Sequence, residues 1–225
     1  MKPIRYLLLL FVVLVASCSS DDNGDIIPIN NCLDGQGVIV TETRVLGNFH
    51  SITSTVYADL LITQGPKEDV LIEAQQNILN ELETTIVNGI LRITLKQCVD
   101  INQAIKIHIT IPDIKTITLT GVGDVVAQND YDLPFLNIVL TGTGDFILRG
   151  TTPRLNITIT GVGDVKSFQL ISNICDVLIS GVGDAEVFVN DELNVTITGT
   201  GTVFYKGNPV INSNITGTGS VIDAN

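Results

Sequence analysis

The sequence is poor in the residues on which most binding and catalytic sites depend. Its 225 residues include no tryptophan, one methionine, two histidines, seven phenylalanines and four tyrosines. Twelve lysines and arginines stand against 24 aspartates and glutamates, so the formal net charge is -12. Nucleic-acid binding depends on clustered basic residues that neutralise phosphates, and the sequence has no such cluster. Nucleic acid is therefore excluded as a partner, and the scarcity of histidine leaves little material for a catalytic centre.

The chain is rich in β-branched residues. Hydrophobic side chains make up 44% of the sequence, and Ile, Val and Thr are frequent. Such side chains pack well on pleated strands and are less suited to helices. A chain of this length can also bury a substantial core. The composition predicts an all-β protein.

Residues 1–17 have the pattern of a secretory signal peptide. Lys2 and Arg5 flank the start of an apolar run over residues 6–15, which is too short to span a membrane. The tetrapeptide VASC, ending at Cys18, resembles the lipobox of bacterial lipoproteins, in which cleavage precedes a cysteine that carries a diacylglycerol. This resemblance predicts that acylated Cys18 binds the protein to a lipid bilayer. The alternative is a plain cleaved signal with a chance cysteine.

Residues 18–35 are predicted to form an acidic, flexible tether, because residues 19–25 are polar, acidic and include glycine. The expected location is the outer membrane of a Gram-negative bacterium. The acidic stretch also resembles the surface-export signals of some Gram-negative lipoproteins, whereas a simple spacer explains it nearly as well. The cell surface and the periplasmic face both stay open.

Three cysteines remain once Cys18 is acylated, an odd number for an exported chain. Cys175 falls at an inward position of the repeat described below and is expected to be a small buried apolar residue. Cys32 and Cys98 are candidates for a disulfide, since export leads into an oxidising space. Two free thiols are the alternative.

A short motif recurs six times between residues 115 and 222. Each copy contains Gly-x-Gly, usually followed by Asp, and the first glycine returns every 18 to 21 residues. A period of this length is typical of a stacked array, in which each unit buries its apolar face on its neighbours. The glycines of these bends are predicted to be structural turn residues: Gly121, Gly123, Gly142, Gly144, Gly161, Gly163, Gly181, Gly183, Gly199, Gly201, Gly217 and Gly219.

Apolar and polar residues alternate strictly before each bend. Ile117 and Leu119 are apolar in the first copy, whereas Thr116 and Thr120 are polar, and the other copies repeat this phase. Alternation with period two indicates a strand with one face in a core. A strand, a bend, a second strand and a loop in about 19 residues fit one coil of a parallel β-helix. Because parallel crossovers are nearly always right-handed, we predict a single-stranded right-handed parallel β-helix, a solenoid, with an antiparallel sandwich as the alternative.

The sequence before the repeats lacks the motif but keeps the composition of strands. Strands are predicted at residues 37–45, 51–64, 69–75, 84–87, 90–95 and 101–111, and one helical turn is allowed at residues 76–82. No linker separates this segment from the repeats. The sequence therefore predicts one domain over residues 36–225, whose irregular β N-terminal half supplies opening coils or a cap.

Four aspartates that follow the bends are the strongest candidates for chemistry, and they should form a column: Asp124, Asp145, Asp164 and Asp184. One hypothesis is a calcium site, but the nonapeptide spacing of calcium-binding β-rolls is missing. A second is a pair of glycosidase carboxyls, but no aromatic, Arg or His residue repeats beside the column. A third is structural, with each Asp accepting backbone N–H bonds in an Asx-type turn. Thr202 and Ser220 replace Asp in the last two copies and favour the structural role, so neither a metal nor a cofactor is expected.

Two further sets of polar residues are expected to be structural. His50 and His108 stand alone and are assigned surface or turn roles. A column of amides is predicted to form a side-chain ladder that extends the hydrogen bonding of the sheet, with an outward ligand-binding stripe as the alternative. The column consists of Asn137, Asn156, Asp176, Asn194 and Asn212.

Three segments before the repeats carry a family resemblance. They read RVLGNFHSI at residues 44–52, LITQG at residues 61–65 and NGILRI at residues 88–93. In this order, and followed by the repeats, they resemble the head GIN domain family of auto-transporter adhesins over roughly residues 40–222. The resemblance implies a β-helical exported domain with no established enzymatic activity or ligand.

These features predict a membrane-anchored, non-catalytic lipoprotein that serves as an adhesion or interaction module for an unidentified protein or glycan. One alternative is a polysaccharide lyase or hydrolase on the same scaffold. A purely structural protein of the cell envelope is the other.

Overall fold

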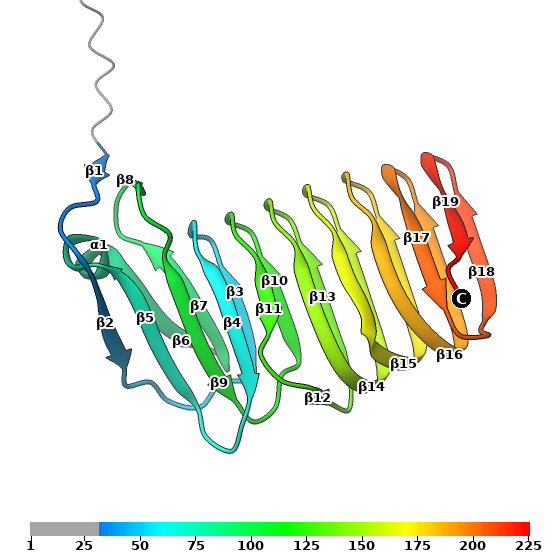
Figure 1. The fold of residues 1–225 in the computed structure, drawn as a ribbon, viewed down its shortest axis with the longest axis horizontal. Helices are drawn as coiled ribbons and strands as arrows, with labels where there is room; N and C mark the ends of the chain where they lie inside the picture. The colour runs from blue at the N-terminus through cyan, green and yellow to red at the C-terminus, as the bar shows by residue number, and fades with distance from the viewer. Residues whose placement is uncertain (1–31) are drawn as a thin grey trace, which may run out of the picture. The chain divides into compact units, whose positions relative to one another are not determined.

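The computed structural model describes residues 32–225, which form one compact unit. The predicted signal peptide, Cys18 and most of the predicted tether lie outside the described residues. Within residues 32–225, no helix is long and apolar enough to cross a membrane. The described chain is a stack of β-coils, as Figure 1 shows.

The repeat half consists of parallel strands that pair with their equivalents in the neighbouring coils. Ile138 lies beside Ile117 on one side and beside Ile157 on the other, so identical positions of the repeat stack directly. This register confirms the solenoid predicted from the alternation. The strands are β10 (Thr116–Leu119), β11 (Val125–Ala127), β12 (Tyr131–Asp132), β13 (Leu136–Leu140), β14 (Phe146–Ile159), β15 (Val165–Ile179), β16 (Ala185–Ile197), β17 (Thr200–Lys206), β18 (Val210–Ile215) and β19 (Thr218–Asp223).

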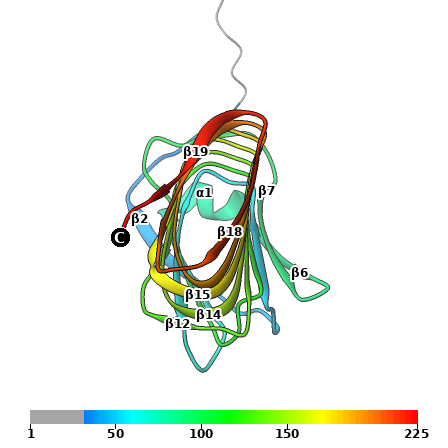
Figure 2. The same ribbon diagram turned by 90° about the vertical axis from the view of Figure 1, so that its right-hand side faces the viewer.

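Each coil is a flattened loop with two long sides, visible end-on in Figure 2. We call the strands that precede the Gly-x-Gly bends the first sheet and the strands that follow them the second sheet. The inward residues of both sheets, such as Ile117, Leu119 and Val125, are fully buried. Burying an aliphatic side chain of this size contributes roughly 1.5–3 kcal/mol, so the column of inward residues is the main stabilising feature of the stack.

A further coil, which the sequence analysis missed, stacks onto the repeats. It consists of β3 (Ser51–Ser54) and β4 (Asp59–Gln64), which pair in parallel with β10 and β11. Val56 and Ala58 occupy the places of the two glycines in this bend. On the other side of this bend, the chain leaves the stack between Ile93 and Ile105. Thr55 N–H donates to the Ile93 carbonyl oxygen, whereas Asp59 N–H donates to the Ile105 carbonyl oxygen. This segment therefore leaves room for the two side chains. The Gly-x-Gly motif begins after residue 115, but the coil before it stacks in the same way without the motif.

The N-terminal half closes the end of the stack with antiparallel pairs. β2 (Ile39–Arg44) and β9 (Lys106–Ile111) flank β5 (Asp69–Gln75), and β6 (Leu82–Val87) forms a hairpin with β7 (Ile90–Leu95). The predicted helical turn is α1 (Gln76–Glu81), which buries Ile78 and Leu79. In the end-on view, α1 lies across the interior of the coils (Figure 2). The N-terminal half therefore forms a cap, one of the two arrangements predicted from the sequence.

The order of stacking differs from the order of the chain in this half. β3 pairs with β7 on one side and with β10 on the other. β4 is likewise placed between β9 and β11. The first coil in sequence therefore lies between two later coils, a threading that local sequence patterns do not encode.

The predicted boundary of the tether at residue 35 is also wrong. β1 (Leu33–Asp34) pairs with β8 (Val99–Asp100), so residues 32–35 belong to the folded unit. The pairing places Cys32 next to Cys98, and the two form a disulfide with Cα atoms 4.6 Å apart. Cys175 is a free, buried cysteine, as expected.

Candidate functional site

The two glycines of each bend are required for different reasons. A Cβ on the first glycine would collide with the backbone of the preceding coil, as at Gly161, where it would lie 2.0 Å from the carbonyl oxygen of Gly142. The second glycine combines such a collision with a positive φ, as at Gly163, where φ is +140° and the Cβ would lie 2.0 Å from the Gly144 oxygen. The bends therefore bring backbone directly onto backbone, and their repeated glycines are structural.

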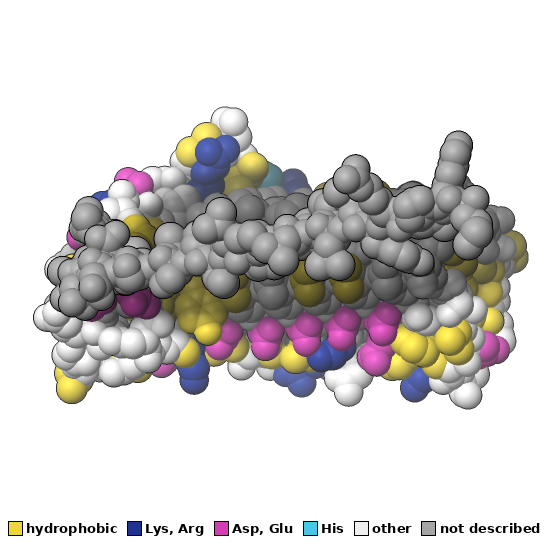
Figure 3. Space-filling view, turned by 90° about the horizontal axis from the view of Figure 1, so that it is seen from above, with side chains coloured by type: hydrophobic (Ala, Val, Ile, Leu, Met, Phe, Trp, Pro, Cys, Tyr) yellow, Lys and Arg dark blue, Asp and Glu magenta, His cyan; other side chains and the backbone are white. Residues whose placement is uncertain are grey.

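The aspartate column links each coil to the next. Asp124 Oδ1 accepts the backbone N–H of Asp145 at 3.0 Å, Asp145 that of Asp164 at 2.9 Å, and Asp164 that of Asp184 at 2.8 Å. Asp59 extends the column at its start, since its Oδ1 accepts the N–H of Asp124. The row is visible in Figure 3. The carboxylates are backbone acceptors, as predicted, but they bond to the adjacent coil rather than within an Asx-type turn of their own.

Lys166 enters this column and neutralises one of its carboxylates. Lys166 Nζ lies 2.6 Å from Asp145 Oδ2. Partial burial alone would raise the pKa of Asp145, but the hydrogen bonds from Lys166 and from the Asp164 N–H outweigh it and lower the pKa. The hydrogen bond that Lys166 donates to Asp145 raises the pKa of Lys166, and the charges of Asp164 and Asp124 reinforce this shift. Among residues 32–225, no three His, Cys, Asp or Glu side chains are grouped so that they could hold a metal ion.

The last two bends have a different backbone. β17 and β19 run straight through them, and neither Gly201 nor Gly219 has a positive φ. Thr202 N–H still donates to Asp184 Oδ1, at 2.6 Å, but beyond this point the bends of β17 and β19 pair through regular backbone bonds. Where the aspartate is missing, the strand ladder links the two coils instead.

The asparagine column forms the predicted ladder on the outer face of the first sheet. Asn156 Nδ2 donates to Asn137 Oδ1 at 2.6 Å, and Asn212 Nδ2 donates to Asn194 Oδ1 at 2.9 Å. Asp176 interrupts the ladder because a carboxylate has no N–H to donate, which leaves Asn156 Oδ1 buried without a partner. Arg154 pairs with Asp176 instead, at 2.6 Å. The ladder is a structural feature with one defect.

The two histidines do not meet. His108 Nε2 lies 2.8 Å from Glu73 Oε1 on the surface of the N-terminal half. His50 Nδ1 lies 3.0 Å from Ser51 Oγ, and its ring packs beneath Gly89 in the β6–β7 hairpin. Both have the surface or turn roles that the sequence analysis assigned to them.

Sequence reasoning missed a group of aromatic residues on the outer face of the second sheet. Phe168, Phe188 and Phe204 come from the successive strands β15, β16 and β17, and all three are partly exposed. Hydrophobic side chains gather where the acidic row ends in Figure 3. These phenylalanines do not repeat in register, since Phe188 pairs with Ile171 and Phe204 with Glu186. The available signal was the spacing, since Phe168 and Phe188 each follow a column aspartate by four residues.

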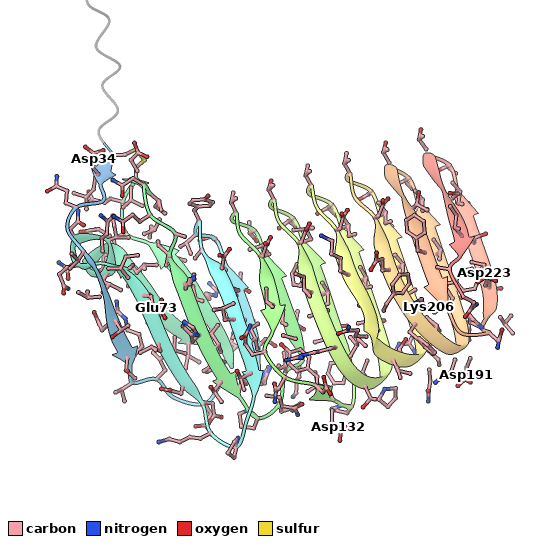
Figure 4. The ribbon with its side chains drawn as sticks, in the orientation of Figure 1. Asp34, Glu73, Asp132, Asp191, Lys206 and Asp223 are labelled. Atoms are coloured by element: carbon pink, nitrogen blue, oxygen red, sulfur yellow. A yellow bond between two sulfur atoms is a disulfide. The ribbon has the colours of Figure 1, made fainter. Side chains whose placement is uncertain are left out.

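A pocket of about 420 Å³ lies beside these aromatic residues, and we call it the aromatic pocket. The Nζ atom of Lys206, a residue labelled in Figure 4, lies 4.6 Å from the centroid of the Phe168 ring. Cation–π contacts at this distance hold an ammonium group over an aromatic face. The residues that line the pocket are Ile147, Leu148, Lys166, Phe168, Gln169, Glu186 and Lys206.

Residues 48–209 match the family described as "Putative auto-transporter adhesin, head GIN domain". The chain belongs to this family. The match confirms the resemblance carried by the three N-terminal segments and the repeats. Comparison with curated proteins gave no match.

Solved structures of similar fold are named as adhesins and as a lipid-binding protein. A "putative adhesin" of Bacteroides fragilis is 23% identical, with a TM-score of 0.72 over 85% of this chain and 99% of its own. A "putative adhesin" of Parabacteroides merdae is 18% identical, with a TM-score of 0.53 over 86% and 99%. A "putative lipid binding protein" of Parabacteroides distasonis is 21% identical, with a TM-score of 0.55 over 86% and 99%. At these identities the likeness shows the fold alone.

Proposed function

We propose that the protein is an outer-membrane lipoprotein, anchored through acylated Cys18, whose solenoid is a non-catalytic adhesion or interaction module. Its ligand is a protein or a glycan, and the module faces the cell surface or the periplasm. Membership of an adhesin family supports the general role. The lipobox resemblance at Cys18 supports the anchor.

The observation that carries the non-catalytic role is the bonding of the aspartate column. A pair of carboxylates that hydrolyses a glycosidic bond must offer one group as an acid and the other as a base or nucleophile. Each repeated aspartate here commits Oδ1 to the N–H of the next coil, and Asp145 also binds Lys166. The most repetitive polar feature of the protein therefore serves the stack, which leaves the outer faces for contact with a ligand.

The anchor is tested with Cys18→Ser, matched by Ser19→Ala as a control that keeps the cysteine. We expect Cys18→Ser to lose incorporation of labelled fatty acid and to appear as an unprocessed precursor or a soluble species, while Ser19→Ala stays membrane-bound. A Cys18→Ser variant that remains mature and partitions into detergent would contradict the lipoprotein proposal.

The role in adhesion is tested by protease shaving of intact cells that express the wild-type protein. Degradation on intact cells would assign the solenoid to the cell surface, where the same treatment should reduce binding of the cells to an immobilised glycan or protein surface. Protection until the outer membrane is permeabilised would assign it to the periplasm. A control strain that carries Cys18→Ser should show neither the cleavage nor the binding. Release of new reducing ends from polysaccharide by the purified protein would contradict the non-catalytic role.

A further inference from the structure

We infer that the aromatic pocket binds an uncharged sugar unit of a glycan. This assignment rests on the proposed function, which it deepens by naming the ligand class and the residues that contact it. Three features carry it: a bulge that builds the pocket, polar groups in the pocket that lack partners, and a surrounding charge that selects among ligands.

The pocket exists because β15 bulges. Ser167 pairs with Val187, but the next pair along is Ile171 with Phe188, so three residues of β15 have no counterpart in β16. Bulges of this kind re-aim side chains and are common next to binding sites. Here the extra residues include Phe168 and Gln169, both of which line the pocket.

Two buried serines stabilise the bulge from inside. Ser167 Oγ donates to the Glu186 carbonyl oxygen at 2.5 Å, and Ser172 Oγ donates to the Phe188 carbonyl oxygen at 3.1 Å. Both serines are fully buried. A buried carbonyl without a partner is destabilising, so hydroxyls at these two positions allow the strand to deviate without that penalty. The two serine hydroxyls therefore stabilise the β15 bulge.

The polar groups at the pocket have hydrogen-bonding capacity left over. Lys166 is held by Asp145, whereas within residues 32–225 Lys206 has no carboxylate at ion-pair distance and lies on the Phe168 ring. In the same part of the chain, the side chains of Gln169 and Glu186 make no hydrogen bond. An ammonium, an amide and a carboxylate thus offer donors and acceptors around an apolar surface formed by Ile147 and Phe168. A sugar ring is complementary to this surface, because it has hydroxyl groups at its rim and C–H groups on its faces.

Neighbouring aromatic residues extend the apolar surface along the stack. Phe204 lies beside Glu186 in register, and Phe188 lies beside Lys206. Successive coils are about 4.8 Å apart, a step comparable to the length of one sugar unit in an extended chain. A short oligosaccharide can therefore contact the pocket and the two adjoining phenylalanines together.

Charge selects the class of glycan. Asp164 and Asp184 directly precede the strands that carry Lys166 and Glu186, and the whole chain has a formal charge of -12. Such a surface repels polyanions at long range, and one free lysine does not reverse the sign. The pocket therefore favours a neutral hexose or N-acetylhexosamine chain over a polyuronic acid.

The test is calorimetric titration of the full-length lipoprotein in detergent micelles. The probes are neutral tetrasaccharides of glucose, galactose, mannose and N-acetylglucosamine, with tetragalacturonic acid as the charged counterpart. We expect one of the neutral probes to bind and the acidic probe to bind at least tenfold more weakly. Tighter binding of the acidic probe, or binding of none of the neutral ones, would overturn the inference.

Variants assign the binding to the pocket. Phe168→Ala, Gln169→Ala and Lys206→Gln should each weaken binding of the neutral probe, by about tenfold for Phe168→Ala. Phe135→Ala and Lys96→Ala, which change the same residue types elsewhere, should leave it unchanged. If Phe168→Ala unfolds the protein, Gln169→Ala and Lys206→Gln decide, because both side chains end at the surface. Unaltered binding in these variants would refute the site. Binding of the neutral probe followed by release of new reducing ends from it would instead refute the non-catalytic proposed function and leave the site in place.

Discussion

Each coil has two edges, the Gly-x-Gly bend and the turn opposite to it, and they differ in how regularly they repeat along the stack. At the Gly-x-Gly edge, the central coils repeat the same glycine contacts and the same aspartate bond, at distances of 2.8–3.0 Å. At the opposite edge, one coil inserts β12, another bulges in β15, and the following coils have neither. The variation of the repeat between 18 and 21 residues is therefore absorbed away from the Gly-x-Gly edge, although Gly150 and Gly207 on the opposite side also lie close to the backbone of the neighbouring coil. One edge builds the stack, and the other edge is free to differ from coil to coil.

The largest effect is expected from one glycine inserted at each edge in turn. Insertion between Gly163 and Asp164 displaces the N–H that binds Asp145 and the close contact with Gly144. We expect it to lower the free energy of unfolding by about 4 kcal/mol or more, since it combines backbone strain with lost inter-coil bonds.

The matched insertion lies between Asn190 and Asp191, two exposed residues at the opposite edge. It should lower the free energy of unfolding by no more than about 1 kcal/mol, because the register between β15 and β16 is already irregular at these residues and a bulge accepts an extra residue. Urea titration of both variants makes the comparison. Equal destabilisation would show that the two edges do not differ in tolerance.

A single methyl group at the tight edge should have the next largest effect. Gly163→Ala places a Cβ 2.0 Å from the Gly144 oxygen at a φ of +140°, and we expect a loss of about 3 kcal/mol in unfolding free energy. The control is Gly47→Ala, where the added Cβ meets nothing within 4 Å. Urea midpoints that shift equally for both variants would contradict the proposed close packing.

The aspartate bond should contribute less than the glycine contacts. Asp164→Thr removes the acceptor 2.8 Å from the Asp184 N–H, and we expect a loss of about 1 kcal/mol. Asp164→Asn keeps an oxygen at Oδ1 and should stay within about 0.5 kcal/mol of the wild type. If Asn proved as damaging as Thr in the same titration, the charge of the column would matter more than its acceptor, and a bound cation would have to be reconsidered.

The smallest effect is expected on the outer face of the first sheet, where Asp176 interrupts the amide ladder. Asp176→Asn supplies the N–H that Asn156 Oδ1 lacks, at the loss of an exposed ion pair with Arg154. A hydrogen bond contributes about 1 kcal/mol and an exposed ion pair less, so thermal unfolding should show a stability that is equal or slightly higher. Clear destabilisation would indicate that the Arg154 pair, rather than the ladder, holds this face.

The difference between the edges also explains what the sequence could predict. Period-two alternation and the repeated glycines determine the coil, because both follow from local backbone and burial requirements. The bend at Thr55–Asp59 escaped notice because its neighbour turns away, so Val56 and Ala58 fit where glycine is required elsewhere. The placement of β3 between β7 and β10 depends on pairings between segments distant in sequence, which no local pattern records.

The aromatic pocket was unpredictable for a related reason. Phe168 and Phe188 have similar places in their repeats, but the bulge between Ser167 and Ile171 shifts the register, so that Phe188 pairs with Ile171. A repeat aligned only on its glycines treats such extra residues as loop. The residues most relevant to a ligand therefore lie where the repeat is least regular.

The central claim is that the Gly-x-Gly edge stabilises the stack while the irregular side binds the ligand. It is tested most directly by an alanine scan of one coil, residues 161–180, with two readouts for each variant. These are the urea midpoint and the binding of the neutral tetrasaccharide. Substitutions at Gly161, Gly163 and Asp164 should lower the midpoint, while those at Phe168 and Gln169 should weaken binding and leave the midpoint nearly unchanged. Loss of binding at Asp164 with a wild-type midpoint would contradict the central claim and assign recognition to the aspartate column.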